Sequence, residues 1–199
     1  MAQTQRRNDR RYTYADYCRW PEGERWELID GVAYAMGPAP ARIHQKVLGE
    51  LFRQVANALQ GRNCEAYLAP FDVRLPAGQE SDEELTTIVQ PDLAVICDPS
   101  KLDEKGCRGA PDWIVEVLSP ASASRDHLVK RELYERAGVA EYWLVHPIDR
   151  MVTIYRQSDA GRFRAAEILA CVGQTAVGCL PELVIDWSVV FPESEGEAA

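Results

Sequence analysis

Two carboxylates lie inside apolar segments of this sequence. Asp92 lies within residues 89–96 (VQPDLAVI), and Glu116 lies within residues 113–118 (WIVEVL). An isolated carboxylate is costly to bury, so each must have a partner, take up a proton or bind a cation. If the two segments are adjacent strands, Asp92 and Glu116 form a natural site for Mg²⁺, which accepts one or two carboxylates and keeps several waters for a substrate phosphate. Salt bridges to Lys or Arg are the structural alternative.

A cation close to that pair would complete a site for phosphate chemistry. Lys130 is the candidate, because it lies in a predicted helix that directly follows the segment of Glu116. The same lysine follows Asp126 by four residues. On a solvated helix this spacing gives a weak ion pair of about 0.3–0.5 kcal/mol. Spacing alone leaves both interpretations open.

Apolar periodicity predicts the elements that would position these residues. Asp-Gly between two short apolar stretches predicts a β-hairpin over 24–36, and apolar residues at helical spacing predict a helix over 41–59. A second helix is predicted over 124–137. Nearly continuous apolar runs, typical of strands covered on both faces, predict strands at 64–75, 87–97, 112–118, 141–146 and 151–156, with further strands at 162–169 and 183–187. The strand, helix and strand over 112–146 indicate a crossover unit.

Length and composition favour one globular domain. The chain has 199 residues, of which 46% are apolar and 27% charged, enough to bury a core without disulfides or a metal. We expect an N-terminal arm over 1–23 that is partly disordered, a single domain over 24–191 and an acidic tail over 192–199. Without a long apolar run or a signal-peptide pattern, we expect no membrane span and a cytoplasmic protein.

The net charge of −9 argues against a protein whose whole surface binds nucleic acid. Part of this excess lies in the acidic stretch 80–84 and in the tail after Pro192, both of which we expect to lie away from the proposed site. One basic cleft is therefore compatible with the overall charge.

The six cysteines show no C-x-x-C spacing, and three of them adjoin apolar strand-like runs. A thiol in such a run acts as a small hydrophobic group. We therefore expect buried, reduced cysteines rather than a disulfide framework, a zinc site or a catalytic thiol.

Three further polar residues have two interpretations each. His44 lies on the apolar face of its predicted helix, where a hydrogen-bonded core histidine is favoured over a neighbour of the active site. Asp30 precedes Gly31, which favours turn chemistry. Glu27 could add an outer carboxylate to a metal pocket or shape the hairpin, and the sequence leaves both open.

A family resemblance rests on motifs in a fixed order: 27–31 (ELIDG), His44, Pro91-Asp92, 110–120 (APDWIVEVLSP), Asp126, Lys130, Tyr134 and 138–145 (GVAEYWLV). Over about residues 24–156 the chain resembles a large bacterial family of restriction-endonuclease-like proteins in the PD-(D/E)XK nuclease superfamily. The resemblance implies an α/β (α+β) restriction-endonuclease-like fold, in which helices flank a mixed central β-sheet. It also implies metal-dependent hydrolysis of DNA phosphodiester bonds.

In that family setting, Asp92 and Glu116 would hold Mg²⁺, or Mn²⁺ in its place, and Lys130 would orient the activated water and stabilise the charge on phosphorus. The strict superfamily motif has a lysine two residues after the glutamate, where this chain has Leu118. The resemblance implies that the lysine has moved to the following helix, at Lys130. It also suggests a homodimer formed by the apolar strands after residue 156.

Two other functions stay open at this stage. The charge of −9 and Leu118 are compatible with a catalytically inactive member that acts as a nucleic-acid or protein interaction module. A hydrolase that uses its two carboxylates as acid and base is the second alternative, and it would not require a metal.

Overall fold

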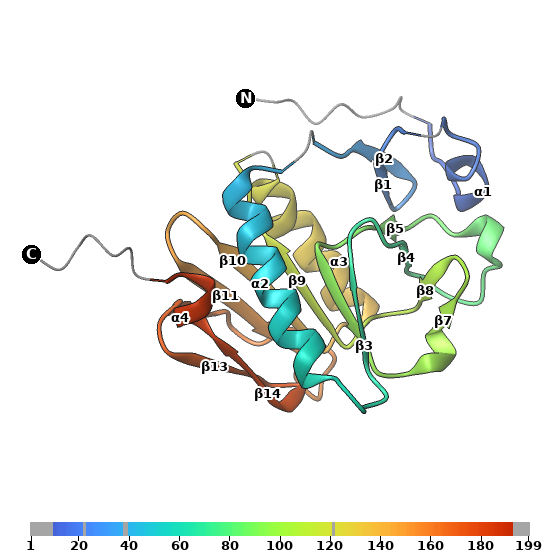
Figure 1. The fold of residues 1–199 in the computed structure, drawn as a ribbon. Helices are drawn as coiled ribbons and strands as arrows, with labels where there is room; N and C mark the ends of the chain where they lie inside the picture. The colour runs from blue at the N-terminus through green and yellow to red at the C-terminus, as the bar shows by residue number, and fades with distance from the viewer. Residues whose placement is uncertain (1–9, 22, 38–39, 121, 193–199) are drawn as a thin grey trace, which may run out of the picture.

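The structure is a computed structural model that describes residues 10–21, 23–37, 40–120 and 122–192. Two six-stranded sheets form its frame (Figure 1). One sheet has the order β2 (Val32–Ala35), β1 (Trp26–Ile29), β5 (Ile88–Val89), β4 (Val73–Arg74), β8 (Gly106–Arg108), β7 (Leu102–Asp103). The other has the order β12 (Glu167–Ala170), β11 (Met151–Arg156), β10 (Glu141–His146), β9 (Trp113–Val117), β6 (Leu93–Ile96), β3 (Glu65–Leu68).

The remaining elements are short, apart from two helical segments. A separate hairpin joins β13 (Gln174–Val177) to β14 (Leu180–Asp186). The helices are α1 (Tyr14–Tyr17), α2 (Arg42–Ala58), η1 (Asp82–Glu84), η2 (Pro99–Lys101), η3 (Arg125–Lys130), α3 (Arg131–Ala137) and α4 (Trp187–Val190). Within these described ranges, no helix combines the length and apolar content that a bilayer span requires.

The sheet that contains β9 is mixed, as predicted. β9 and β10 are parallel, whereas the other pairs in this sheet are antiparallel. The chain between these two strands forms η3 and α3, which gives the predicted crossover. The predicted helix over 124–137 is present, but its first part, η3, is a π-helical turn rather than a regular α-helix, a feature that is often found at functional sites.

Helices cover both faces of this sheet. Trp113, Val115 and Val117 pack in one apolar cluster with the buried face of α2, whereas Ile114 and Leu118 pack in a second cluster with α3. In Figure 1, α2 crosses in front of β9 and α3 lies behind it. Since both faces are covered, the strands are almost continuously apolar instead of alternating, which explains the apolar runs of the sequence.

The predicted hairpin over 24–36 is confirmed as β1 and β2. Asp30 and Gly31 both have positive φ, 49° and 76°, as a two-residue type I′ turn requires. The segment before the hairpin is not all loose: Tyr12 and Tyr14 are buried, and the Tyr12 N–H donates to the Gly31 carbonyl at 2.8 Å. The first nine residues of the expected arm and residues 193–199 of the expected tail lie outside the described residues.

Two predicted strands are each divided between the two sheets. The run 64–75 becomes β3 and β4, interrupted around Pro70, and the run 87–97 becomes β5 and β6, interrupted around Pro91. Proline has no backbone N–H to donate to a sheet, so the chain leaves one sheet and enters the other at these points. Asp92 therefore lies at the junction of the two sheets.

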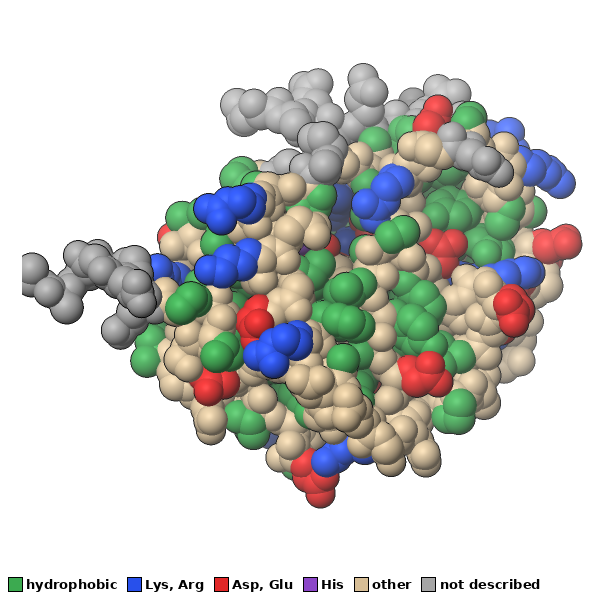
Figure 2. Space-filling model, viewed as in Figure 1, with side chains coloured by type: hydrophobic (Ala, Val, Ile, Leu, Met, Phe, Trp, Pro, Cys, Tyr) green, Lys and Arg blue, Asp and Glu red, His purple; other side chains and the backbone are tan. Residues whose placement is uncertain are grey.

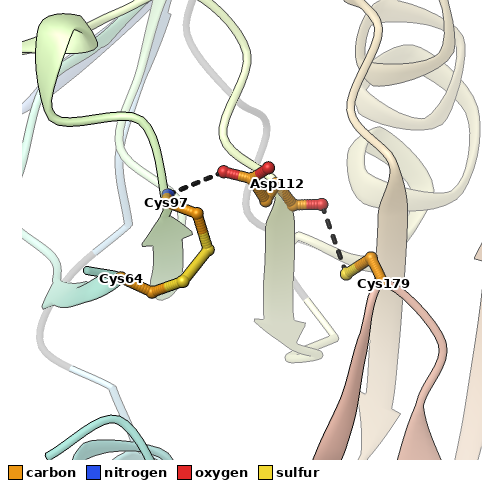
Figure 3. Close-up of a disulfide and its surroundings, with 4 residues drawn as sticks. All are labelled: Cys64, Cys97, Asp112 and Cys179. Atoms are coloured by element: carbon orange, nitrogen blue, oxygen red, sulfur yellow. Dashed lines mark hydrogen bonds between the residues drawn. A yellow bond between two sulfur atoms is a disulfide. The ribbon is translucent and has the colours of Figure 1, made fainter. Parts of the chain in front are cut away.

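The prediction that all six cysteines are reduced is wrong for Cys64 and Cys97, which form a disulfide (Figure 3). β3 and β6 pair antiparallel with Glu65 opposite Ile96, and the next step of this register places Cys64 opposite Cys97. The two cysteines are 33 residues apart in the sequence. Their pairing depends on strand register, which cysteine spacing does not show.

The other four cysteines are free thiols in different environments. Cys107 and Cys171 are buried, Cys179 is half-buried, and Cys18 is exposed, contrary to the expectation that all would be buried. Burial raises the pKa of Cys107 to about 11 and that of Cys171 to about 12. Thiolates are therefore scarce at these two positions at neutral pH.

Titration of thiols with a chromogenic disulfide reagent at pH 8 tests this arrangement. We expect Cys18 to react first in the native protein, four thiols to react in denaturant without a reductant, and all six after reduction. A Cys18→Ser control should remove the fast phase only. Six reactive thiols in denaturant without a reductant would contradict the disulfide.

Candidate active site

Glu116 is the penultimate residue of β9 and is only 4% exposed. Side chains alternate along a strand, so Glu116 shares a face with Ile114, which packs on the α3 side of the sheet. The Glu116 Oε1 atom accepts hydrogen bonds from the Lys130 Nζ atom at 2.7 Å and from the Tyr134 hydroxyl at 3.2 Å. Helix residues thus hold one oxygen of this carboxylate.

Asp92 directly precedes β6, the antiparallel neighbour of β9. Its Oδ2 atom accepts the Val117 N–H at 2.8 Å and lies 3.1 Å from the His44 Nε2 atom. Its own N–H donates to the Glu116 Oε2 atom at 3.4 Å. The two carboxylates therefore converge, and Asp92, whose side chain is 20% exposed, connects the site to solvent.

Lys130 places an ammonium group in the same cluster. It lies at the end of η3 and its side chain is 3% exposed. The Nζ atom is 2.7 Å from Glu116, 2.8 Å from Glu27 and 3.7 Å from Asp126. Lys130 is thus not a solvated helix lysine, and its i,i+4 partner Asp126 is the most distant of its three carboxylates.

Two more charged residues border this cluster. Glu27 on β1 is completely buried, and its Oε2 atom lies 3.7 Å from the Nε atom of Arg125. Arg125 is 13% exposed, and its Nε and Nη1 atoms are buried without a hydrogen-bond partner among the described residues. The site thus combines four carboxyl groups, those of Asp92, Glu116, Glu27 and Asp126, with the cations of Lys130 and Arg125.

Burial and mutual attraction alter the pKa values of the cluster. Burial raises the pKa of Glu116 well above its usual range, although Lys130 acts in the opposite direction. Burial alone would lower the pKa of Lys130, but the carboxylates of Glu116, Glu27 and Asp126 outweigh it and raise this pKa well above the ordinary value. Lys130 is therefore held as an ammonium ion, which provides a positive charge rather than a base.

The structure brings together Asp92, Glu116 and Lys130, the three residues singled out in the sequence. Leu118, at the position of the superfamily lysine, packs in the apolar cluster on the α3 side. His44 is buried, as expected of a core histidine, but its partner is Asp92, so it is also the active-site neighbour that the sequence disfavoured.

The sequence leaves the role of Glu27 open, although Glu27 carries the same signal as Asp92 and Glu116, a carboxylate between apolar residues of a strand. Tyr134 entered only through the family resemblance, and no physical feature of its surroundings in the sequence marks it. Asp30 forms the hairpin turn, as predicted, and its carboxylate pairs with Arg136 at 2.6 Å.

Among the residues that the structure describes, no three His, Cys, Asp or Glu side chains are grouped so that they could hold a metal ion. The two carboxylates that the sequence predicts as ligands of a hard cation are Asp92 and Glu116. A two-carboxylate set suits Mg²⁺, which fills its other positions with water and substrate phosphate.

Comparisons with known proteins give the class of this chain. A crystal structure of a protein described as a putative nuclease belonging to DUF820, from Anabaena variabilis, aligns with a TM-score of 0.70, covering 90% of this chain and 97% of that one at 20% identity. The fold is therefore restriction-endonuclease-like. An uncharacterised protein of Synechocystis, slr1290, is 28% identical over 149 residues, 73% of this chain and 74% of that protein.

The family follows from a match along most of the chain. Residues 14–188 match the family described as "Uma2: Putative restriction endonuclease". The chain belongs to this family, which confirms the resemblance seen in the sequence motifs.

Removal of the buried ammonium tests the electrostatics without any activity assay. In EDTA, we expect Lys130→Met to lower the free energy of unfolding by about 3–5 kcal/mol, because it leaves buried carboxylates without their cation. Glu116→Gln in the same chain should recover part of this loss. Lys105→Met, at a lysine that is 59% exposed, is the matched control and should change little. Urea unfolding gives the free energy of unfolding of wild type, Lys130→Met, the double variant and the Lys105→Met control.

The loss of unfolding free energy in the Lys130→Met variant should depend on pH in a defined direction. Lys130 lowers the pKa of Glu116, so the pKa rises further in the Lys130→Met variant. A carboxyl group with a raised folded-state pKa stabilises the fold below its ordinary pKa, and this contribution is lost as the pH rises through the folded-state pKa. The deficit relative to wild type should therefore be larger at pH 8 than at pH 5.5. Equal deficits at both pH values would contradict the proposed coupling.

Proposed function

We propose that this protein is a metal-dependent endonuclease that hydrolyses phosphodiester bonds of DNA. The observation that carries the proposal is the convergence of Asp92 and Glu116 beside the Lys130 ammonium, at the junction of two sheets. Membership of the family described as "Putative restriction endonuclease" supports it. Mg²⁺ is the proposed cofactor, with Mn²⁺ as a substitute.

Asp92 and Glu116 would hold the metal, and their other contacts suit this task. His44 and the Val117 N–H fix the Oδ2 atom of Asp92, and Lys130 and Tyr134 fix the Oε1 atom of Glu116. When bound, the metal supplies Lewis-acid polarisation of a phosphate oxygen and a water of lowered pKa. Lys130 would orient the attacking water and offset the negative charge that develops on the phosphate.

The surface around α2 suits a polyanionic substrate despite the net negative charge. His44 projects from the first turn of α2 to Asp92, and Arg42 and Lys46 are exposed on the same turns. Figure 2 shows lysine and arginine side chains over this helix, with an acidic side chain among them. Such a local basic strip provides the electrostatic contacts that nucleic-acid binding needs.

A cleavage assay tests the proposal. Wild-type protein with Mg²⁺ or Mn²⁺ should nick supercoiled plasmid, and EDTA should abolish the activity. Asp92→Asn, Glu116→Gln and Lys130→Met should each lower the rate by about 10²–10³-fold, as expected when one charge-stabilising group is removed. Asp98→Asn is the matched control, because Asp98 is exposed beyond the other end of β6 and its side chain accepts hydrogen bonds only from Ser100 among the described residues.

Three outcomes would contradict the nuclease proposal or its metal dependence. Wild-type protein that leaves supercoiled, linear and single-stranded DNA intact with both metals would overturn the catalytic function, and DNA binding without cleavage would favour an interaction module. Activity that survives EDTA would instead support acid and base catalysis by the two carboxylates.

Salt dependence of binding tests the basic strip. With Glu116→Gln to prevent cleavage, we expect DNA affinity to fall steeply with salt concentration. Reversing Arg42 and Lys46 to Glu should weaken binding and reduce the slope of log affinity against log salt by about 2, one for each lost phosphate contact. Arg150→Glu with Arg164→Glu, at two exposed arginines outside the site, is the control. Fluorescence anisotropy measures the affinity; an unchanged slope in the Arg42 and Lys46 variant would exclude this surface.

A further inference from the structure

Glu27 is a buried carboxylate that the proposed hydrolysis does not itself require. It is 0% exposed and belongs to β1, whereas Glu116 lies in the other six-stranded sheet and Lys130 lies in η3. Its Oε1 atom accepts the Gln90 N–H at 3.1 Å and lies 2.8 Å from the Lys130 Nζ atom. Its Oε2 atom is buried without a hydrogen-bond partner in the described residues and faces Arg125 at 3.7 Å.

These contacts distinguish Glu27 from Asp92 and Glu116. Each of its oxygens faces a cation of the protein, Lys130 on one side and Arg125 on the other. An oxygen that faces an ammonium or guanidinium group is unfavourably placed to bind a second cation. Glu27 therefore acts on the protein's own cations rather than on a metal.

The ammonium of Lys130 needs a counter-ion that is independent of Glu116. In this structure the ammonium lies between Glu116 and Glu27, at nearly equal distances of 2.7 and 2.8 Å. If Glu116 shares its charge with a divalent cation, it attracts the ammonium less, and the two cations repel each other. Glu27 would then keep the ammonium in place.

We propose that Glu27 is a positioning residue that holds the Lys130 ammonium within the active site independently of the metal-binding carboxylates. This inference rests on the proposed nuclease function. Through the Gln90 N–H, Glu27 also ties the segment that leads to Asp92 to the helix that carries Lys130. One carboxylate thus sets the distance between the two halves of the site.

Chemical labelling of lysine tests whether Glu27 positions the Lys130 ammonium, without an activity assay. The chain has only four lysines, Lys46, Lys101, Lys105 and Lys130, so limited acylation followed by mass spectrometry resolves each one. With saturating Mg²⁺, Lys130 should be protected in wild type and acylated about tenfold faster or more in Glu27→Gln, since the ion pair with Glu27 is lost. Glu182→Gln, at a surface glutamate paired with Arg62, is the matched control.

A double-mutant cycle on plasmid cleavage tests whether Glu27 acts through Lys130. Glu27→Gln should lower kcat about tenfold or more with little change in KM, because Glu27 touches no substrate. Lys130→Met should lower kcat further, and the double variant should be no slower than Lys130→Met alone. Glu27→Asp, which keeps the charge but shortens the side chain, should restore part of kcat and serves as a second variant if Glu27→Gln does not fold.

The outcomes separate this inference from the proposed function. Equal protection of Lys130 in wild type and Glu27→Gln, or kcat losses that multiply in the double variant, would overturn the positioning role even if the protein is a nuclease. If wild type cleaves no DNA but Lys130 becomes reactive in Glu27→Gln, the proposed nuclease function is wrong, whereas the positioning of the Lys130 ammonium by Glu27 is supported.

Discussion

The burial of one ammonium group among carboxylates is the constraint on which the site depends. Lys130 is withdrawn from water and faces Glu116, Glu27 and Asp126. Each of these charges would be costly alone, and a carboxylate left without the ammonium would take up a proton or destabilise the fold. These charges can therefore be buried only together. Because they come from a hairpin, a central strand and a helix, all three elements must be in place before the cluster is stable.

Topology supplies that placement. The parallel pair β9 and β10 requires a crossover, and the crossover carries η3 and α3 across the face of the sheet to which Glu116 points. On the other side of the site, the proline-interrupted segment before β6 passes from one sheet to the other and leaves Asp92 at their junction. The site is thus formed where the end of β9, the start of β6 and the segment η3 meet.

Local patterns predicted much of this arrangement. The hairpin turn at Asp30 and Gly31, the helix α2 and the strands β9, β10 and β11 follow from turn chemistry and apolar periodicity, which act over a few residues. Asp92 and Glu116 stand out because a carboxylate in an apolar strand demands a partner. The division of two predicted strands between sheets, and the disulfide from Cys64 to Cys97, depend on contacts between distant segments.

The sequence by itself determined which residues need a partner, because burial of a charge is costly wherever the chain folds. It marked Asp92 and Glu116 by this criterion, and it offered the same signal at Glu27. Only the tertiary structure decided which partners they have: that Lys130 faces inward from a π-helical turn, that His44 contacts Asp92, and that Glu27 reaches Lys130 from another sheet. Charge pairing across more than a hundred residues is set by strand order and register, which no local pattern contains.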